Sequence, residues 1–347
     1  MRNVVLLVLD TVRKDTFDEH ATRIQELADT TADRCYAPSS WSVPSHASML
    51  AGSLPHQHGV HSYNPDYATI DETFLTELDH RTFGVSANGV VSEAFGFDIH
   101  FDDFAGFAGN DERSPEALSF KRLDSQSGLD RYLEYVRRAA QEDRLAASLL
   151  NGLYIQANNF LDGLPIPNIG DGGAAATINR SLSMIQNQEP FFLFQNFIDA
   201  HGPLQNTRLL DSSVPYKWSS HELSDEKSRS VDLTGDEATY FDRYRDLYAA
   251  NVRYLDRKVA EFVTQVRAST DRETVVIVTA DHGEELRYPG ERDLGHMDFS
   301  TSLLHVPFAV IGADVSEAID GPMSLTDVGK LITGLANREP IPDLTRD

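Results

Sequence analysis

The run Asn3–Leu9, apolar from its second residue onward, is the feature that most limits how this chain can fold. It is too short to span a bilayer, and it leads straight into Asp10 without a small-residue cleavage site. Buried strands that alternate with helices are typical of α/β proteins with a mainly parallel central sheet and helices on both faces, which is the fold class predicted here. Four more apolar runs of strand length follow, at 82–86, Phe191–Phe197, Thr274–Thr279 and 306–311.

Helical patterns separate several of these runs. The clearest spans 237–267, where apolar residues recur at spacings of three and four and predict one face packed on the sheet. A second helical stretch at 130–161 follows a weakly patterned segment, 105–128, that resembles an insertion shaping substrate access. The polar stretch 212–235 is typical of a loop. Because no repeat or linker is evident, we expect residues 1–347 to form a single catalytic domain.

Charge excludes two classes of partner. With 54 acidic and 30 basic residues, the chain carries a formal charge of −24, which opposes binding to nucleic acid or to an anionic membrane. The bases are mainly Arg, and such a surface suits a halophilic source; ordinary acidic solubility is the alternative. Cys35 is the single cysteine and is expected to be a buried thiol, so no intrachain disulfide can form. We expect a cytoplasmic protein without membrane insertion.

Acidic residues end two of the expected strands. Asp10 follows the first, and Asp281 and His282 follow the strand Thr274–Thr279. Ligands collect at the carboxyl ends of parallel strands, so these side chains can converge into a metal site with oxygen and nitrogen ligands. Taken singly, each residue is equally typical of a strand-terminal cap or turn.

A Ser-rich segment at 38–52 is the second candidate site. It predicts a short helix that begins at His46, ends near Gly52 and is capped by Ser45, so that Ser42 lies just ahead of its N-terminus. A helix N-terminus holds sulfate or phosphate, and a nearby cation lowers the pKa of a hydroxyl, so Ser42 is a candidate nucleophile. The alternative is an ordinary capped turn.

Three motifs in this order resemble the sulfatase family of the alkaline-phosphatase superfamily: residues 3–13, 41–52 and 279–284. Short matches at 55–60, 199–203, 251–256, 294–296 and 304–307 extend the resemblance over nearly the whole chain. It implies an alkaline-phosphatase-like fold and a metal-dependent hydrolase with one divalent ion (Mn, Ca, Mg or Zn). The implied metal ligands are Asp10, Ser42, Asp281 and His282. The implied catalytic residues are Ser42 as nucleophile with His201, His296 and His46, and the implied substrate-binding residues are Arg13, His201 and His296.

The chain departs from the family pattern at three places. His46 replaces the Arg of the Cys/Ser-x-Pro-x-Arg motif, which disfavours oxidation of Ser42 to formylglycine. Thr11 replaces the second acid of an Asp-Asp pair, which removes a calcium ligand and favours manganese, magnesium or zinc. Only a helical segment at 325–336 follows Ile311, so we expect a reduced C-terminal subdomain.

Three functions remain open from the sequence. The first is an arylsulfatase-like hydrolase that cleaves the sulfate ester of a sugar or other small metabolite through Ser42. The second is a phosphomonoesterase, phosphodiesterase or phosphotransferase that uses unmodified Ser42, because a phospho-serine can be resolved by water. The third is a metal- or glycan-binding scaffold without turnover. The natural alcohol and the oligomeric state are not predicted.

Overall fold

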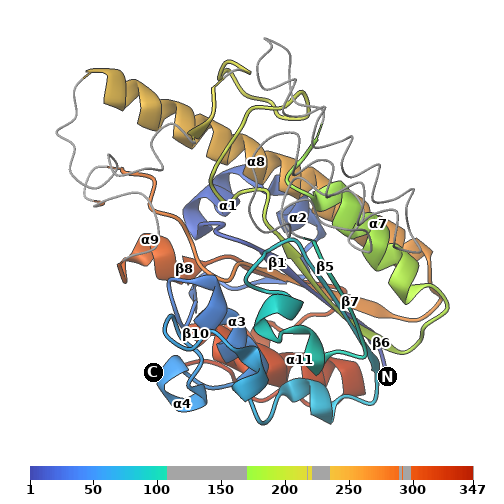
Figure 1. Ribbon diagram of the computed structural model, residues 1–347. Coiled ribbons are helices and arrows are strands. Elements are labelled where there is room, and N and C mark those ends of the chain that lie inside the picture. Colours follow the sequence, from blue (N-terminus) through green and yellow to red (C-terminus); the bar gives the residue numbers. More distant parts are fainter. Residues whose placement is uncertain (108–169, 217, 221–234, 289–290, 292–297, 347) are drawn as a thin grey trace, which may run out of the picture.

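A seven-stranded sheet forms the centre of the computed structural model, which describes residues 1–107, 170–216, 218–220, 235–288, 291 and 298–346 (Figure 1). Its strand order is β2-β9-β7-β1-β6-β4-β5, parallel from β7 to β5 and antiparallel at β9 and β2. The mainly parallel α/β fold is thus confirmed. The bounds are β1 Asn3–Leu9, β2 Thr30–Thr31, β4 Arg81–Ser86, β5 Asp103–Gly106, β6 Phe191–Phe197, β7 Thr274–Thr279 and β9 Phe308–Ile311.

The three central strands are predominantly apolar runs in the sequence, although β6 also contains Gln195 and Asn196. Every residue of β1, β6 and β7 is buried, as expected for strands covered on both faces. The expected single strand at 306–311 is wrong in one respect. Pro307, which has no N–H to donate, separates β8 (His305–Val306) from β9, and β8 pairs with β3 (Cys35–Tyr36) in a second, three-stranded sheet.

Helices cover both faces of the central sheet (Figure 1). One face carries α1 (Lys14–His20), α2 (Thr22–Leu27), α7 (Ala174–Ile185) and the long α8 (Gly235–Ala268), whose predicted apolar stripe is buried. The opposite face carries α3 (Ser42–Ala51) and α11 (Val328–Asn337). The short helices are α4 Pro55–His58, α9 Thr301–Leu304, α10 Ser316–Ile319, η1 Tyr67–Thr69, η2 Phe74–Glu77, η3 Glu93–Phe95, η4 Asp98–His100 and η7 Leu325–Asp327.

The start of α3 differs from the expectation. The helix begins at Ser42, with Trp41 at the N-cap, and it ends at Gly52 in a left-handed conformation as expected. Ser45 therefore lies inside the helix rather than at its cap. Its hydroxyl donates instead to the carbonyl oxygen of Asp281 at 2.6 Å, which ties α3 to the end of β7.

After β9 the chain adds α10, the short strand β10 (Met323–Ser324), η7 and α11, and β10 pairs with β3 in the smaller sheet. The helical stretch expected at 130–161 and most of the loop expected at 212–235 lie outside the described residues. The single domain over 1–347 accordingly stays a prediction. In the portion of the chain that is described, no helix combines the length and the apolar character needed to cross a bilayer.

Candidate active site

Parallel pairing brings the carboxyl ends of β1 and β7 to one edge of the sheet. Val8 lies opposite Thr279, and two residues further along each strand come Asp10 and Asp281. One ligand atom from each of Asp10, Asp281 and His282 lies within 4.8 Å of those of the other two. Within the described ranges this is the one group of His, Cys, Asp and Glu that could hold a metal ion, and its three side chains have no exposed surface.

The two carboxylates differ in pKa, and each has one oxygen atom without a hydrogen-bond partner. Oδ1 of Asp10 and Oδ2 of Asp281 are buried without a hydrogen-bond partner. Burial and the neighbouring Asp281 raise the pKa of Asp10 to about 7. Burial also acts to raise the pKa of Asp281, but His282, His46 and the hydrogen bonds from Ser42 and the Thr11 amide together lower that pKa. Two buried carboxylates beside a histidine nitrogen are a donor set that fits a divalent cation.

His282 presents a lone pair to this centre. Its Nδ1 lies 2.8 Å from the carbonyl oxygen of Gly283, which can only accept, so Nδ1 carries the proton. Its Nε2 is then an acceptor and lies 3.2 Å from Oγ of Ser42. A hydrogen bond that orients the ring through its second nitrogen is the usual support for a histidine ligand.

Ser42 lies against the same groups as the first residue of α3. Its Oγ is 3.2 Å from Nε2 of His282 and 3.5 Å from Oδ2 of Asp10, and the side chain is 2% exposed. The hydroxyl is therefore at the N-terminal end of a ten-residue helix and next to the candidate metal ligands. This arrangement suits a nucleophile that attacks a bound oxyanion ester.

Thr11 occupies the position of the missing second acid. Its backbone N–H donates to Oδ1 of Asp281 at 3.3 Å, and its hydroxyl donates to the carbonyl oxygen of Asp10. With φ of 62°, this β-branched residue adopts a left-handed conformation that costs about 1–3 kcal/mol. In this conformation the backbone N–H of Thr11, rather than a carboxylate, contacts the candidate metal ligand Asp281.

His46 contacts the site from the second turn of α3. Its Nδ1 donates to the carbonyl oxygen of Ser42 at 2.8 Å and lies 3.5 Å from Oδ2 of Asp281. Its Nε2 accepts from the amide of Asn196 at 3.2 Å. Burial lowers the pKa of His46 despite the nearby carboxylate, so a neutral ring holds the start of the helix between β6 and β7. Both nitrogens are engaged within the protein.

The remaining candidate residues have different surroundings. Arg13 donates to the carboxylates of Asp15 and Glu291, at 2.6 Å to each, so its guanidinium is paired with protein acids. His201 follows β6, the neighbour of β1, and its Nδ1 bonds the carbonyl oxygen of Gly202. His296 lies outside the described residues. The substrate-binding roles of these three residues stay predictions.

Asn88 is a site residue that the sequence analysis missed. Its Nδ2 donates to Oδ2 of Asp10 at 2.5 Å and to Oγ of Ser42 at 3.2 Å. It follows β4, two strands from β1 across β6. The signal was present, because a polar residue at the carboxyl end of an expected strand is the same pattern that identified Asp10. Asn196 was also missed, because it lies within the apolar β6.

Comparison with known proteins identifies the family. A sulfatase family model matches residues 2–337. The chain belongs to the sulfatase family. Choline-sulfatase from Rhizobium meliloti (strain 1021) is 23% identical over 364 aligned residues, which cover 96% of this chain and 67% of the relative. This sulfatase-family chain thus spans about two thirds of the length of that relative.

Solved structures show the same fold. Phosphonate monoester hydrolase SpPMH from Silicibacter pomeroyi has a TM-score of 0.62 at 14% identity, covering all of this chain and 76% of the other. The protein BT4656, in complex with its substrate D-glucosamine-2-N,6-O-disulfate, also has a TM-score of 0.62, at 12% identity, covering 98% and 77% of the two chains. The predicted alkaline-phosphatase-like fold and family membership are confirmed.

Proposed function

We propose that this sulfatase-family chain is a metal-dependent hydrolase of sulfate esters, with Oγ of Ser42 as the nucleophile. The observation that carries the proposal is the position of this hydroxyl, 3.2 Å from both Nε2 of His282 and Nδ2 of Asn88 at the first residue of α3. A bound oxyanion ester would meet the positive end of a helix and a buried hydroxyl at one place.

The side chains divide the chemistry between them. Asp10, Asp281 and His282 would hold one divalent cation, which supplies positive charge that neutralises the ester and favours loss of the hydroxyl proton. The Asn88 amide donates to Oγ and stabilises its anionic form. His46 holds the first turn of α3 in place, and His201 is the proposed donor of a proton to the leaving alcohol.

The proteins similar to this chain support two candidate types of ester substrate. The choline-sulfatase likeness favours a sulfate ester such as choline sulfate, and the fold shared with BT4656, whose substrate is a sulfated glucosamine, adds a sugar sulfate as a candidate. The structural likeness to a phosphonate monoester hydrolase adds esters of phosphorus oxyacids to the candidates, and phosphoryl transfer by unmodified Ser42 is accordingly the second proposal. The two differ in the state of Ser42, because a sulfo-serine lacks the easy release that the hydrate of formylglycine provides.

Hydrolysis of an aryl sulfate and an aryl phosphate by metal-loaded protein tests the proposal. We expect sulfate release to fall by ~10³-fold or more in Ser42→Ala, since removal of a nucleophile leaves only binding and electrostatic effects. The control is Ser53→Ala, a half-buried serine just beyond α3 that should leave the rate unchanged. Activity on the phosphate alone would reject the sulfatase assignment, and metal binding without hydrolysis of either would favour a scaffold.

The mass of the Ser42 peptide from the native host separates the two chemistries. Loss of two hydrogens together with a reactive carbonyl would identify formylglycine and support sulfate ester hydrolysis. An unmodified or phosphorylated serine would favour phosphoester chemistry.

A further inference from the structure

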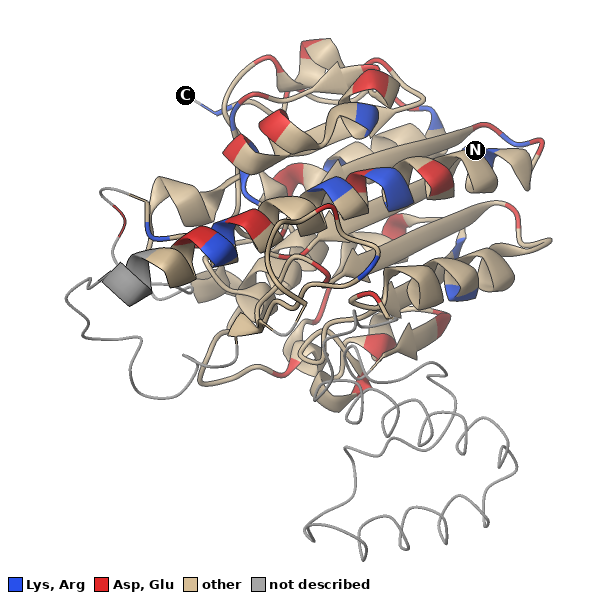
Figure 2. Cartoon of the chain, turned by 90° about the horizontal axis from the view of Figure 1, so that it is seen from above, with Lys and Arg blue, Asp and Glu red and all other residues tan. Residues whose placement is uncertain are grey.

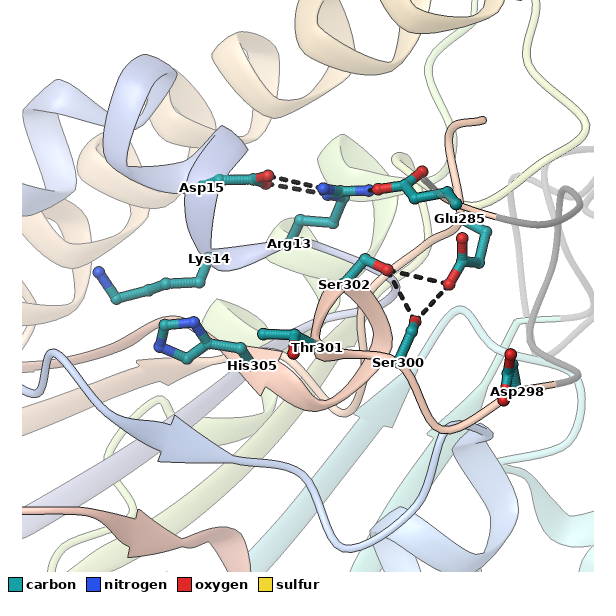
Figure 3. A pocket seen from close by; sticks show the side chains of 10 residues that line it. Arg13, Lys14, Asp15, Glu285, Asp298, Ser300, Thr301, Ser302 and His305 are labelled. Carbon is teal, nitrogen blue, oxygen red and sulfur yellow. Dashed lines mark hydrogen bonds and ion pairs between the residues drawn. The ribbon is translucent and has the colours of Figure 1, made fainter. Parts of the chain in front are cut away.

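A pocket of about 510 Å³ is lined in part by residues that follow the candidate metal ligands along the chain (Figure 3). Its volume is in the range of small-molecule sites. Its walls come from the start of α1, the segment after β7 and the region of α9. The lining residues are Arg13, Lys14, Asp15, Glu285, Glu291, Asp298, Ser300, Thr301, Ser302 and His305.

The pocket and the metal centre share the same two loops. Arg13 comes three residues after Asp10, and Glu285 comes three residues after His282. The segments that contain Gly283, Ser302 and Arg13 pack closely together. A Cβ on Gly283 would overlap the backbone oxygen of Ser302 and come within 3.3 Å of Cγ of Arg13. The pocket is therefore walled in part by the two segments that also carry the candidate metal ligands.

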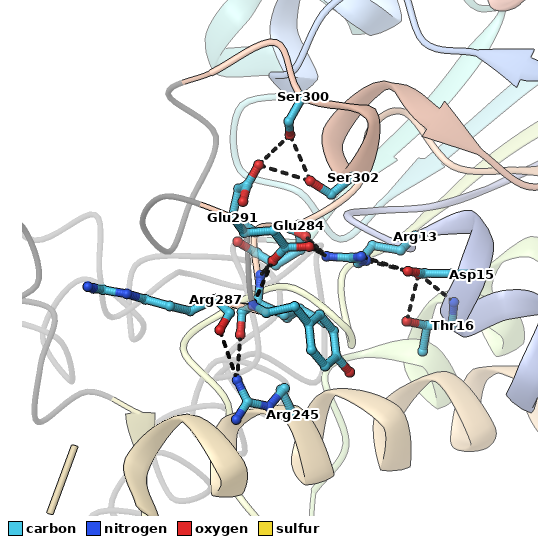
Figure 4. Close-up of polar contacts among 12 residues, drawn as sticks. Arg13, Asp15, Thr16, Arg245, Glu284, Arg287, Glu291, Ser300 and Ser302 are labelled. Carbon is cyan, nitrogen blue, oxygen red and sulfur yellow. Dashed lines mark hydrogen bonds and ion pairs between the residues drawn. The ribbon is translucent and has the colours of Figure 1, made fainter. Parts of the chain in front are cut away.

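Negative charge predominates in the pocket. Four carboxylates line it against the two permanent cations Arg13 and Lys14. Both carboxylate oxygens of Asp15 bind Arg13, and Oε1 of Glu291 does so as well (Figure 4). Lys14 is paired with Asp18, 2.5 Å away. Neither cation is thus available to neutralise the acids on the opposite wall.

Glu285 is an acid on that wall whose buried carboxylate is only partly hydrogen-bonded. It is 3% exposed, and its Oε1 accepts hydrogen bonds from the hydroxyls of Ser300 and Ser302 (Figure 3). Its Oε2 has no hydrogen-bond partner. A buried carboxylate oxygen without a donor is costly, so this atom points to a ligand that brings a hydrogen-bond donor or a positive charge.

The ligand class follows from the spacing of these acids. Among the described residues, no three acidic or histidine side chains of this pocket approach within 4.8 Å, so it lacks the compact donor set of a metal ion. We propose that the pocket binds an organic ammonium group, carried by the alcohol part of the substrate, through Glu285. This inference rests on the proposed function and narrows the substrate to the oxyanion ester of a cationic alcohol.

Hydrolysis of matched esters tests the inference. 2-Aminoethyl sulfate and propyl sulfate differ in replacing an ammonium by a methyl group. We expect kcat/KM of the unaltered protein to be at least tenfold higher for the aminoethyl ester, and Glu285→Gln to reduce this preference about tenfold while sparing the propyl ester. Gln retains an acceptor for Ser300 and Ser302, and Glu317→Gln, an exposed acid outside the pocket, is the control. Equal turnover of both esters by the unaltered protein would overturn the inference, whether or not the variant folds.

Binding of free alcohols separates the pocket from the reaction. Calorimetric titration with ethanolamine and with 1-propanol requires no ester cleavage. Ethanolamine should bind at least tenfold more tightly to the unaltered protein than to Glu285→Gln, and 1-propanol should show no such difference. This result without any ester hydrolysis would support the pocket and overturn the proposed function. Equal affinity for the two alcohols would overturn the pocket even in an active sulfatase.

Discussion

At the residue scale, Asp10 links metal binding to pH. Its pKa rises from an ordinary value of 3.8 to about 7 in the folded, metal-free chain because of burial and the nearby Asp281. The folded state therefore holds a proton that the unfolded state loses, so this group's contribution to stability falls as pH rises from about 4 to about 7. A bound cation requires the carboxylate and removes this loss.

We accordingly expect the increase in Tm on adding Mn²⁺ to metal-free protein to be larger at pH 8 than at pH 5.5. Thermal unfolding in chelator and in excess Mn²⁺ at the two pH values measures it. Asp10→Asn is the control and should abolish most of the increase at both. An increase in Tm that is independent of pH would contradict the electrostatic account of Asp10.

Asn88 supports a second prediction at this scale. Its amide donates to both Ser42 and Asp10, so Asn88→Ala removes one donor from the nucleophile and one from a candidate metal ligand. We expect kcat for the preferred ester to fall by ~10²-fold, a typical loss for a donor to a developing anion. Steady-state kinetics at saturating metal measure it. Asn337→Ala, at the end of α11, should keep the full rate, and an unchanged kcat in Asn88→Ala would exclude this role.

At the scale of elements, the segment after β7 depends on a glycine. The backbone oxygen of Ser302 occupies the space that a Cβ on Gly283 would need, and a backbone oxygen cannot rotate away as a side chain can. We expect Gly283→Ala to reduce the free energy of unfolding by ~1–3 kcal/mol, as overpacking does. Denaturant unfolding measures the loss. Gly89→Ala, where a Cβ meets nothing within 4 Å, should change stability little, and equal effects at the two positions would refute the packing argument.

At the scale of the whole molecule, the acidic charge is the dominant property. Acidic side chains occur on helices and loops throughout the view in Figure 2, and the formal charge is −24. Repulsion among them is screened by salt, since the Debye length falls from about 10 Å at 0.1 M to about 3 Å at 1 M. We expect Tm to rise with KCl, mainly below 1 M. A scan of Tm against KCl measures this, and a constant or falling Tm would contradict it. Halophilic source and cytoplasmic location stay predictions.

Much of this protein could be derived from its sequence. Asn3–Leu9, Phe191–Phe197 and Thr274–Thr279 are predominantly apolar runs, and the residues of such runs are buried whichever neighbour they pair with. Asp10 follows the first of those strands directly and Asp281 follows the third after one intervening residue, so their convergence needed only the rule that parallel strands share an edge.

Contacts between distant segments decided the rest. The local sequence predicts that Ser45 caps a helix. Its hydroxyl instead donates to the carbonyl oxygen of Asp281, 236 residues away, and α3 begins at Ser42. Asn88 reaches Ser42 only because β4 and β1 lie on either side of β6. The buried strands and the acids that end them were therefore predictable from the sequence, because hydrophobic periodicity is a local property. The polar atoms that meet at the nucleophile, and those that are left without a partner such as Oε2 of Glu285, depend on the folded arrangement of the chain, because hydrogen bonding depends on positions in space rather than on distance along the chain.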